Sequence, residues 1–251
     1  MSDPTLQPTL IHYLPIVTTI LSVIFLGVLL RRYAQRGSGA HLLWWAAGIF
    51  FYGLGTGIES VITLWGNSIL LNKAWYIAGA LLGGYPLAQG TVYLLLRRRT
   101  ANMLTWMTIL FVVVCAVLVI LSPVNVETLL PHKPGGNVLA WTWVRALTPI
   151  INLYAAAFLI GGALLSMYRY ALDPAMRHRA VGNALIALGA ILPGFGGGLA
   201  KAGIVEALYV GELAGLILIW LGYAACVRPP RPLTENSSAA HSSLASTLPS
   251  A

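Results

Sequence analysis

The sequence predicts an all-α integral membrane protein, a bundle of seven transmembrane helices with the N-terminus outside and the C-terminus inside. Three observations predict this fold class. The chain of 251 residues is 58% hydrophobic and only 9% charged, whereas soluble domains carry about 25% charged residues. Its mean hydropathy is +0.79. The apolar residues fall into runs of about 20, the length of helix that crosses the hydrocarbon of a bilayer.

Seven apolar runs define the predicted spans. In chain order they cover residues 10–30, 42–65, 75–96, 103–121, 144–167, 180–200 and 204–226. We expect residues 1–9 to form a short extracytoplasmic N-terminus and residues 10–227 to form one transmembrane domain. Residues 228–251 are rich in Ser, Ala, Thr and Pro. They predict a disordered cytoplasmic tail, because such a segment cannot bury enough apolar surface to fold.

The basic residues predict the orientation of the bundle. The formal net charge is +8, but the lysines and arginines stand in short clusters between apolar runs, which indicates topology signals rather than nucleic-acid binding. With seven spans, most of them fall on one side: Arg31, Arg32, Arg36, Arg97, Arg98, Arg99, Arg169, Arg177, Arg179, Arg228 and Arg231. The other side receives Lys73, Lys133, Arg145 and Lys201. The richer side should be cytoplasmic, which predicts a multi-pass protein of a bacterial inner membrane.

The tryptophans agree with this orientation. Trp44 and Trp45 mark the predicted inner interface. Four others mark the predicted outer interface: Trp65, Trp75, Trp141 and Trp143. Two aromatic belts at the bilayer surfaces are typical of membrane proteins.

One stretch of the second run, Gly53-Leu54-Gly55-Thr56-Gly57-Ile58-Glu59-Ser60, combines small residues with a carboxylate. A charged side chain at mid-helix costs about 2.5–3.5 kcal/mol on an insertion scale, so Glu59 should face protein or trapped water rather than lipid. The glycines should let a neighbouring helix approach closely. Tyr52, Thr56 and Glu59 follow a helical spacing and form one polar stripe.

Other polar residues are predicted in the same outer half of the bundle. Tyr209 precedes Glu212 by three residues, so the two share a helix face. The ligand-binding residues that we predict line a small polar pocket open to the outside: Glu59, Thr56, Tyr52, Asn152, Tyr154, Tyr209 and Glu212. The alternative is structural, with Glu59 and Glu212 paired to Arg145 or Lys201 so that they fix helix packing.

The sixth run contains the segment Pro193-Gly194-Phe195-Gly196-Gly197-Gly198. It leaves two interpretations open. One is a kinked helix packed closely on its neighbours, and the other is an unwound segment that lines a cavity.

The sequence carries no pattern for several common chemistries. The seventh run has no lysine for a retinal Schiff base, and His12 and His41 lie at opposite depths, so they cannot share a haem. No cluster of His and carboxylates has metal-ligand spacing, and no hydrolase or nucleotide motif is present. We therefore predict no catalytic residues, no cofactor and no metal. The arginine clusters could bind lipid head groups, although such clusters more often only set topology.

Residues 20–95 resemble a known module. The features are the basic loop from Arg31, the entry Leu42-Leu43-Trp44-Trp45, the late carboxylate Glu59 and the opening Trp75-Tyr76-Ile77-Ala78-Gly79. They are similar to the start of the seven-helix sensor module that precedes the kinase or cyclase domain in some bacterial histidine kinases and diguanylate cyclases. The chain also resembles uncharacterised stand-alone bacterial seven-helix proteins. No kinase or cyclase follows Arg231, so the resemblance implies a separate output partner.

Three functions remain open at this stage. The first is a non-enzymatic sensor-like or accessory protein that holds a small apolar or lipid-like ligand in the outer half of the bundle. It would signal to a separate membrane or cytoplasmic partner. The second is a small transporter, coupled to protons or to a substrate through the buried carboxylates. The third is a membrane enzyme that acts on lipid. The lipid bilayer is the one partner common to all three, and none involves nucleic acid.

Overall fold

The structure is a computed structural model that describes residues 9–228, with the side chain of Lys201 left out. Nearly all of this range is helical, and one isolated β-bridge joins Val124 to Leu139. The main helices are α1 (Leu14–Arg36), α2 (Ala40–Trp65), α3 (Ile69–Trp75), α4 (Tyr85–Leu95), α5 (Arg98–Leu121), α6 (Thr142–Ala155), α7 (Gly161–Ala171), α8 (Arg177–Lys201) and α9 (Val205–Val227). Two π-helices, η3 (Tyr76–Leu81) and η6 (Ala156–Ile160), and four 3₁₀ turns, η2 (Leu10–Tyr13), η4 (Val126–Thr128), η5 (Gly136–Val138) and η7 (Pro174–Met176), join them. The predicted termini, except for residues 9 and 228, lie outside the described residues.

Six stretches of the described chain are long and apolar enough to cross a membrane: Leu10–Arg36, Ala40–Trp65, Arg98–Leu121, Thr142–Ala171, Pro174–Ala200 and Val205–Val227. They correspond to six of the seven predicted runs and support a multi-pass helical membrane protein. Their outward faces are apolar, as lipid-facing surfaces are. On α5, for example, Trp106 is 73% exposed and Leu110 is 66% exposed.

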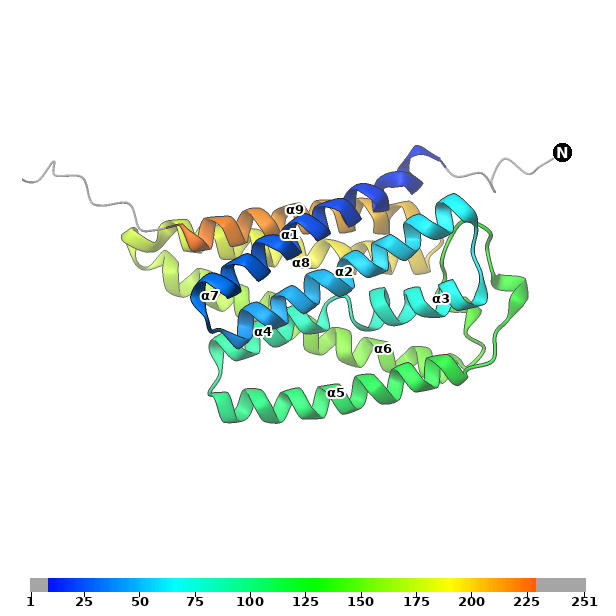
Figure 1. The fold of residues 1–251 in the computed structure, drawn as a ribbon, viewed down its shortest axis with the longest axis horizontal. Helices are drawn as coiled ribbons and strands as arrows, with labels where there is room; N and C mark the ends of the chain where they lie inside the picture. The colour runs from blue at the N-terminus through cyan, green and yellow to red at the C-terminus, as the bar shows by residue number, and fades with distance from the viewer. Residues whose placement is uncertain (1–8, 229–251) are drawn as a thin grey trace, which may run out of the picture.

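The predicted third run is not one continuous helix. It consists of α3, the π-helix η3 and α4, with a turn at residues 82–84 between η3 and α4. The local sequence explains the break. Gly83 lies so close to the carbonyl of Gly79 that a side chain would collide with it. Pro86 follows in the first turn of α4, where its missing N–H is tolerated. In Figure 1, α3 and α4 nevertheless run one after the other along α2.

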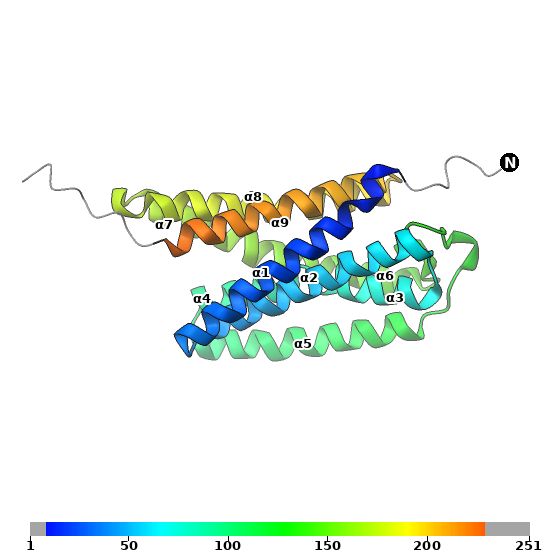
Figure 2. The ribbon, with the colours of Figure 1, turned by 45° about the horizontal axis from the view of Figure 1, so that its top comes forward.

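The helices lie roughly along the long axis of the bundle, and the two ends of the described chain lie at opposite ends of it (Figure 1). In Figure 2, α7, α8 and α9 form one layer, α2 to α6 form the other, and α1 crosses between them.

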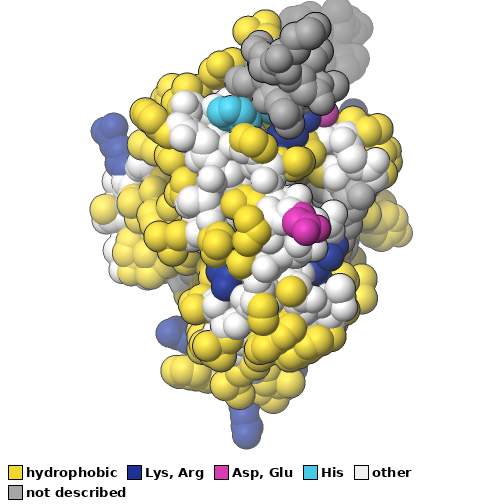
Figure 3. Space-filling model, turned by 90° about the vertical axis from the view of Figure 1, so that its right-hand side faces the viewer, with side chains coloured by type: hydrophobic (Ala, Val, Ile, Leu, Met, Phe, Trp, Pro, Cys, Tyr) yellow, Lys and Arg dark blue, Asp and Glu magenta, His cyan; other side chains and the backbone are white. Residues whose placement is uncertain are grey.

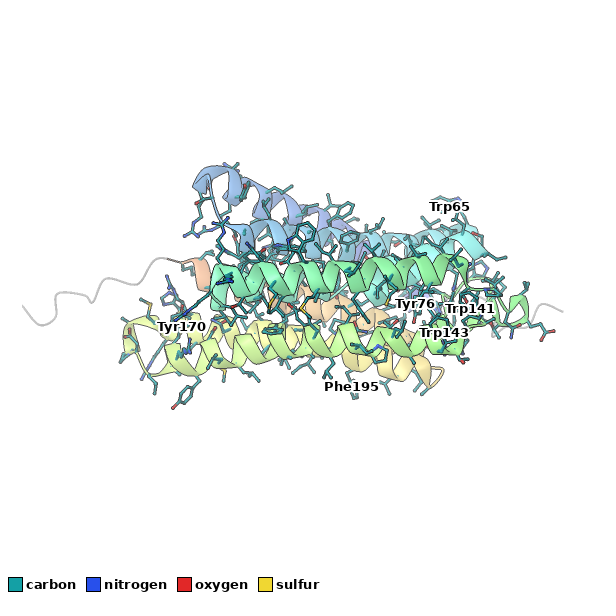
Figure 4. The ribbon with its side chains drawn as sticks, turned by 90° about the horizontal axis from the view of Figure 1, so that it is seen from below. Trp65, Tyr76, Trp141, Trp143, Tyr170 and Phe195 are labelled. Atoms are coloured by element: carbon teal, nitrogen blue, oxygen red, sulfur yellow. The ribbon has the colours of Figure 1, made fainter. Side chains whose placement is uncertain are left out.

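Trp65, Trp141 and Trp143 lie together at one end, which we call the tryptophan end, and Tyr170 lies at the other (Figure 4). We call that second end the arginine end, because the clusters around Arg32, Arg98 and Arg177 all border its turns. Figure 3 shows the tryptophan end, where hydrophobic side chains surround a few charged ones.

The close approach predicted around the glycines of the second helix is confirmed. A Cβ on Gly53 would stand 2.7 Å from the Cβ of Ser22 on α1. A Cβ on Gly55 would stand 3.0 Å from the Cα of Gly79 in η3. These contacts place α1 and η3 on either side of the α2 segment that carries Glu59.

The helix α8 is continuous through Pro193, so the unwound interpretation of the sixth run is not what the structure shows. The glycines of this helix serve close packing instead. Gly189 lies against the backbone of Gly215, and Gly196 lies against the backbone of Ala207, both on α9. Small residues of this kind let two helix backbones meet directly.

A buried hydrogen-bond network joins α4, α5 and α6. Gln89 is 0% exposed, and its amide nitrogen donates to Thr105 Oγ1 at 2.7 Å. Its amide oxygen accepts from the hydroxyl of Tyr154 at 2.6 Å. Because both ends of the amide are used, the residue fixes the relative positions of three helices.

We expect Gln89→Leu to destabilise the bundle by about 1–3 kcal/mol, because leucine is of similar size but leaves the half-buried Tyr154 hydroxyl without its acceptor. The midpoint of thermal unfolding in mild detergent measures the effect. Thr91→Val is the matched control on the same helix, since the Thr91 hydroxyl reaches only the Leu87 carbonyl of its own helix. Equal midpoints for the two variants would show that the network contributes nothing to stability.

Candidate functional site

Two predicted carboxylates meet inside the bundle. The side chains of Glu59 on α2 and Glu212 on α9 lie near each other. Glu59 is 0% exposed, and the Oε2 atoms of both residues are buried with no hydrogen-bond partner among the described residues.

Neighbouring donors hold the two carboxyl-bearing segments in place. The indole nitrogen of Trp75, at the end of α3, donates to Glu59 Oε1 at 2.6 Å. The hydroxyl of Tyr52 donates to the backbone oxygen of Glu212 at 2.7 Å and so ties α2 to α9. The hydroxyls of Thr56 and Thr19 lie 2.9 Å apart and tie α2 to α1. These hydrogen bonds tie the segments around Glu59 and Glu212 to each other, to α1 and to the end of α3.

A row of polar side chains leads from the pair towards the tryptophan end. Tyr209 is 0% exposed, and its hydroxyl has no hydrogen-bond partner among the described residues. Its ring meets the ring of His12 edge to face, with centroids 5.7 Å apart. His12 Nε2 lies 3.5 Å from Glu206 Oε1. Lys133 Nζ donates to the same Glu206 oxygen at 3.0 Å, where both side chains are partly exposed.

The structure brings together five of the predicted ligand-binding residues, namely Tyr52, Thr56, Glu59, Tyr209 and Glu212. The other two lie apart from them. Asn152 is on the exposed face of α6, and Tyr154 belongs to the Gln89 network.

The partners that the structural alternative gave to the carboxylates are not found beside them in the part of the chain that is described. Arg145 donates to the side chain of Asn137 instead. The side chain of Lys201 lies outside the described residues. Within residues 9–228, the two ion pairs found both involve Glu206, with His12 and Lys133.

Trp75 is the part of this cluster that the sequence did not indicate. We expected it at the outer interface, yet it points inwards to Glu59. The sequence offers no local signal for the contact, because the two residues lie on different helices and are brought together by the close approach of η3 to Gly55.

We expect Trp75→Phe to lower stability by about 1.5–3 kcal/mol, the usual contribution of a hydrogen bond to a charged group. The matched control is Trp65→Phe, because Trp65 is 76% exposed at the same end of the bundle. Thermal unfolding followed by near-ultraviolet circular dichroism compares the two variants. An equal effect of both would mean that the indole hydrogen bond does not matter.

A second candidate site is a cavity of about 490 Å³ at the arginine end. Seven helical segments contribute to its wall: α1, α2, α4, η6, α7, α8 and α9. The wall is mostly apolar, with Phe25, Leu42, Ile49, Leu159 and Ile219 among its residues. This size is typical of sites for small organic ligands.

The charged residues around this cavity are all basic. Arg32, Arg36, Arg169 and Arg179 contribute to it, together with His41. None of its lining residues is an aspartate or a glutamate. The guanidinium of Arg179 lies 5.7 Å from the ring centre of Tyr170, and its Nε atom is buried without a partner among the described residues. An anionic group is the natural complement of such a set.

The sequence did not indicate this cavity, although it did suggest that the arginine clusters could bind lipid head groups. The reason is geometric. Its wall is assembled from seven helical segments between Phe25 and Val227, and no segment of the chain contributes a recognisable motif.

The two sites share structural elements. The helix α2 carries Glu59 and also the cavity residues Trp45 and Ile49, and α9 carries Glu212 and also the cavity residue Tyr223. A shift of either helix would therefore displace residues of both sites.

Comparison with known proteins gives no further guide, since the chain matches no family model, no curated protein and no solved structure.

Proposed function

We propose that this protein is a non-enzymatic, multi-pass membrane protein that binds an anionic amphiphile of the lipid class in the cavity at the arginine end. One observation carries this proposal: an apolar chamber is bordered by four arginines and by no carboxylate. The acyl part of such a ligand would lie against the wall formed by Phe25, Leu42 and Ile49. Its phosphate or carboxylate would meet the guanidinium groups, which can bind either group in a bidentate manner.

The orientation in the membrane places this cavity on the cytoplasmic side. With α3, η3 and α4 together counted as a seventh span, the arginine end faces the cytoplasm by the positive-inside rule, in a bacterial inner membrane. The ligand then sits at the cytoplasmic level of the bundle rather than in the outer half that the sequence suggested. The resemblance to a sensor module supports a role in which the occupied protein acts on a separate signalling partner.

Native mass spectrometry tests the binding. Protein purified in mild detergent is offered phosphatidylglycerol, a free fatty acid or phosphatidylcholine at equal concentration. We expect retention of the two anionic ligands and little retention of the zwitterionic one. A preference for phosphatidylglycerol over the fatty acid would identify the head group as phosphate. Equal retention of all three, or of none, would overturn the proposal.

A second candidate function is a small proton-coupled transporter. The observation that favours it is the broken third run beside a buried carboxyl pair, since discontinuous helices and intramembrane carboxylates occur together at transporter sites. Flux of a labelled anionic amphiphile into liposomes under a pH gradient tests it. Transport that Glu59→Gln abolishes would favour the transporter, and binding without flux would favour the sensor-like protein.

A further inference from the structure

We propose that the hydroxyl of Tyr223 binds the ester carbonyl of the ligand, so that the cavity at the arginine end prefers an ester-linked phospholipid to an ether-linked one. This inference rests on the proposed function and names its ligand more closely. It is carried by one unused hydrogen-bond donor that stands at a defined level of the cavity, between the arginines and the apolar floor.

Tyr223 is almost fully buried, but its hydroxyl is not used by the protein. The residue is 6% exposed and belongs to the wall of the cavity. Its hydroxyl oxygen is buried with no hydrogen-bond partner among the described residues. A buried polar group without a partner is costly, and nearly all such groups in folded proteins meet protein, water or ligand. In the wall of a ligand cavity, an acceptor oxygen of the ligand is the natural partner.

Two aromatic rings fix the direction of the Tyr223 side chain. Its ring centre lies 5.6 Å from that of Phe25 on α1 and 6.4 Å from that of Trp45 on α2. The ring of Phe25 is itself held by stacking on Trp220 of α9, with centroids 5.2 Å apart. Phe25 and Trp45 are also wall residues of the cavity. The Tyr223 side chain therefore reaches from α9 towards α1 and α2, and a ligand in the cavity lies beside it.

The same contacts give the level of Tyr223 along the bundle. On α1, Phe25 stands seven residues before Arg32, which corresponds to about 10 Å of helix. On α9, Ile219 stands four residues before Tyr223, about 6 Å nearer the middle of the bundle. Arg32, Phe25 and Ile219 all line the cavity. Tyr223 is thus deeper than the arginines and shallower than the innermost apolar residues.

The wall of the cavity changes from basic to apolar in the same direction. Arg179 stands at the arginine end, in the first turn of α8, whereas Ile49 of α2 and Leu87 of α4 lie nearer the middle of the bundle. In the described wall, Arg179 Nε and the Tyr223 hydroxyl are the two buried donors without a partner. One stands at the basic level and the other at the level below it.

A phospholipid presents its groups in this order. Its phosphate comes first, its ester carbonyls come next, and its acyl chains follow. A guanidinium is the usual partner of a phosphate, and a tyrosine hydroxyl can donate to a carbonyl. A free fatty acid has only its carboxylate above the chain, and an ether-linked lipid lacks the carbonyl oxygen. The order of donors along the wall therefore favours a phospholipid with an ester-linked chain.

Matched ester-linked and ether-linked phosphatidylglycerols test the inference. The two lipids carry the same head group and chains of the same length, and they differ in the carbonyl oxygens. Each is titrated into the purified protein in mild detergent and followed by native mass spectrometry. We expect the wild type to bind the ester-linked lipid about 3- to 10-fold more tightly, the effect of one hydrogen bond. We expect Tyr223→Phe to bind both lipids equally, with the affinity of the wild type for the ether-linked lipid.

Tyr170→Phe is the matched control, because Tyr170 also lines the cavity but lies at the arginine level, beside Arg179. It should keep the ester preference. Equal binding of the two lipids by the wild type overturns the inference without use of any variant. An ester preference that survives in Tyr223→Phe, or that is lost equally in Tyr170→Phe, also overturns it. In these cases anionic lipids still bind better than phosphatidylcholine. Loss of that anionic preference would instead overturn the proposed function, and this inference with it.

Discussion

Replacing Gly189 by leucine will prevent α8 and α9 from packing and will yield little folded protein. A Cβ at this position would stand 2.6 Å from the backbone oxygen of Gly215 and 2.9 Å from the backbone nitrogen of Ile219. Backbone atoms of a helix cannot move aside as a flexible side chain can. The side chain must therefore separate the two helices, which exceeds the usual cost of overpacking, about 1–3 kcal/mol.

The same contact repeats along the two helices, so the damage extends beyond one residue. A Cβ on Gly182, one heptad before Gly189, would stand 2.7 Å from the backbone oxygen of Gly222. A Cβ on Gly196, one heptad after Gly189, would stand 2.5 Å from the backbone oxygen of Ala207. A spacing of seven residues returns to the same side of a helix after two turns. Separation at the middle contact also loosens the contacts above and below it, because the two helices are rigid.

Size-exclusion chromatography in mild detergent measures the outcome as the fraction of monodisperse protein. Gly194→Leu is the matched control, since Gly194 is on the same helix and a Cβ added there would meet no heavy atom within 4 Å. We expect Gly194→Leu to behave as the wild type. Similar loss in both variants would mean that α8 tolerates no large residue anywhere and that the glycine contacts are not the cause.

This packing also shows where the sequence was informative. Apolar run length predicted the membrane class and six of the spans, because a helix in lipid must satisfy its own backbone. Insertion cost predicted that Glu59 would turn away from lipid, and Glu59 is indeed fully buried. These predictions succeeded because each depends only on one helix and on the lipid that surrounds it.

The predictions that differ from the structure depend on a neighbour that one segment cannot reveal. The glycine-rich segment around Pro193 suggested a possible break, yet α9 packs on it and α8 stays helical. The break falls at residues 82–84 instead. Asn152 sits on an apolar helix at a depth similar to that of the cluster, but its side of α6 is exposed. Depth follows from counting residues, whereas the direction of a side chain follows from the contacts between helices.

Two arginines of the cavity should account for most of its affinity for an anionic ligand. We expect the double variant Arg169→Gln, Arg179→Gln to weaken the binding of an anionic amphiphile about 100-fold or more. Each hydrogen bond between charged groups contributes about 1.5–3 kcal/mol, and glutamine retains some polarity but no charge. Titration of phosphatidylglycerol into the purified protein, followed by native mass spectrometry, measures the affinity. High salt should weaken wild-type binding more than binding by the variant, because part of the attraction has been removed.

The control is Arg98→Gln, Arg99→Gln. Those two arginines are exposed at the same end of the bundle and do not line the cavity, so the change in net charge is the same. Equal loss of affinity in both double variants would mean that only the general field of the arginine end attracts the ligand.

The stability of the ligand-free protein separates binding from folding. Because the cavity arginines repel one another and no carboxylate lines the cavity, removing two of them should leave the unfolding midpoint unchanged or higher. A large fall in that midpoint would instead make them structural residues.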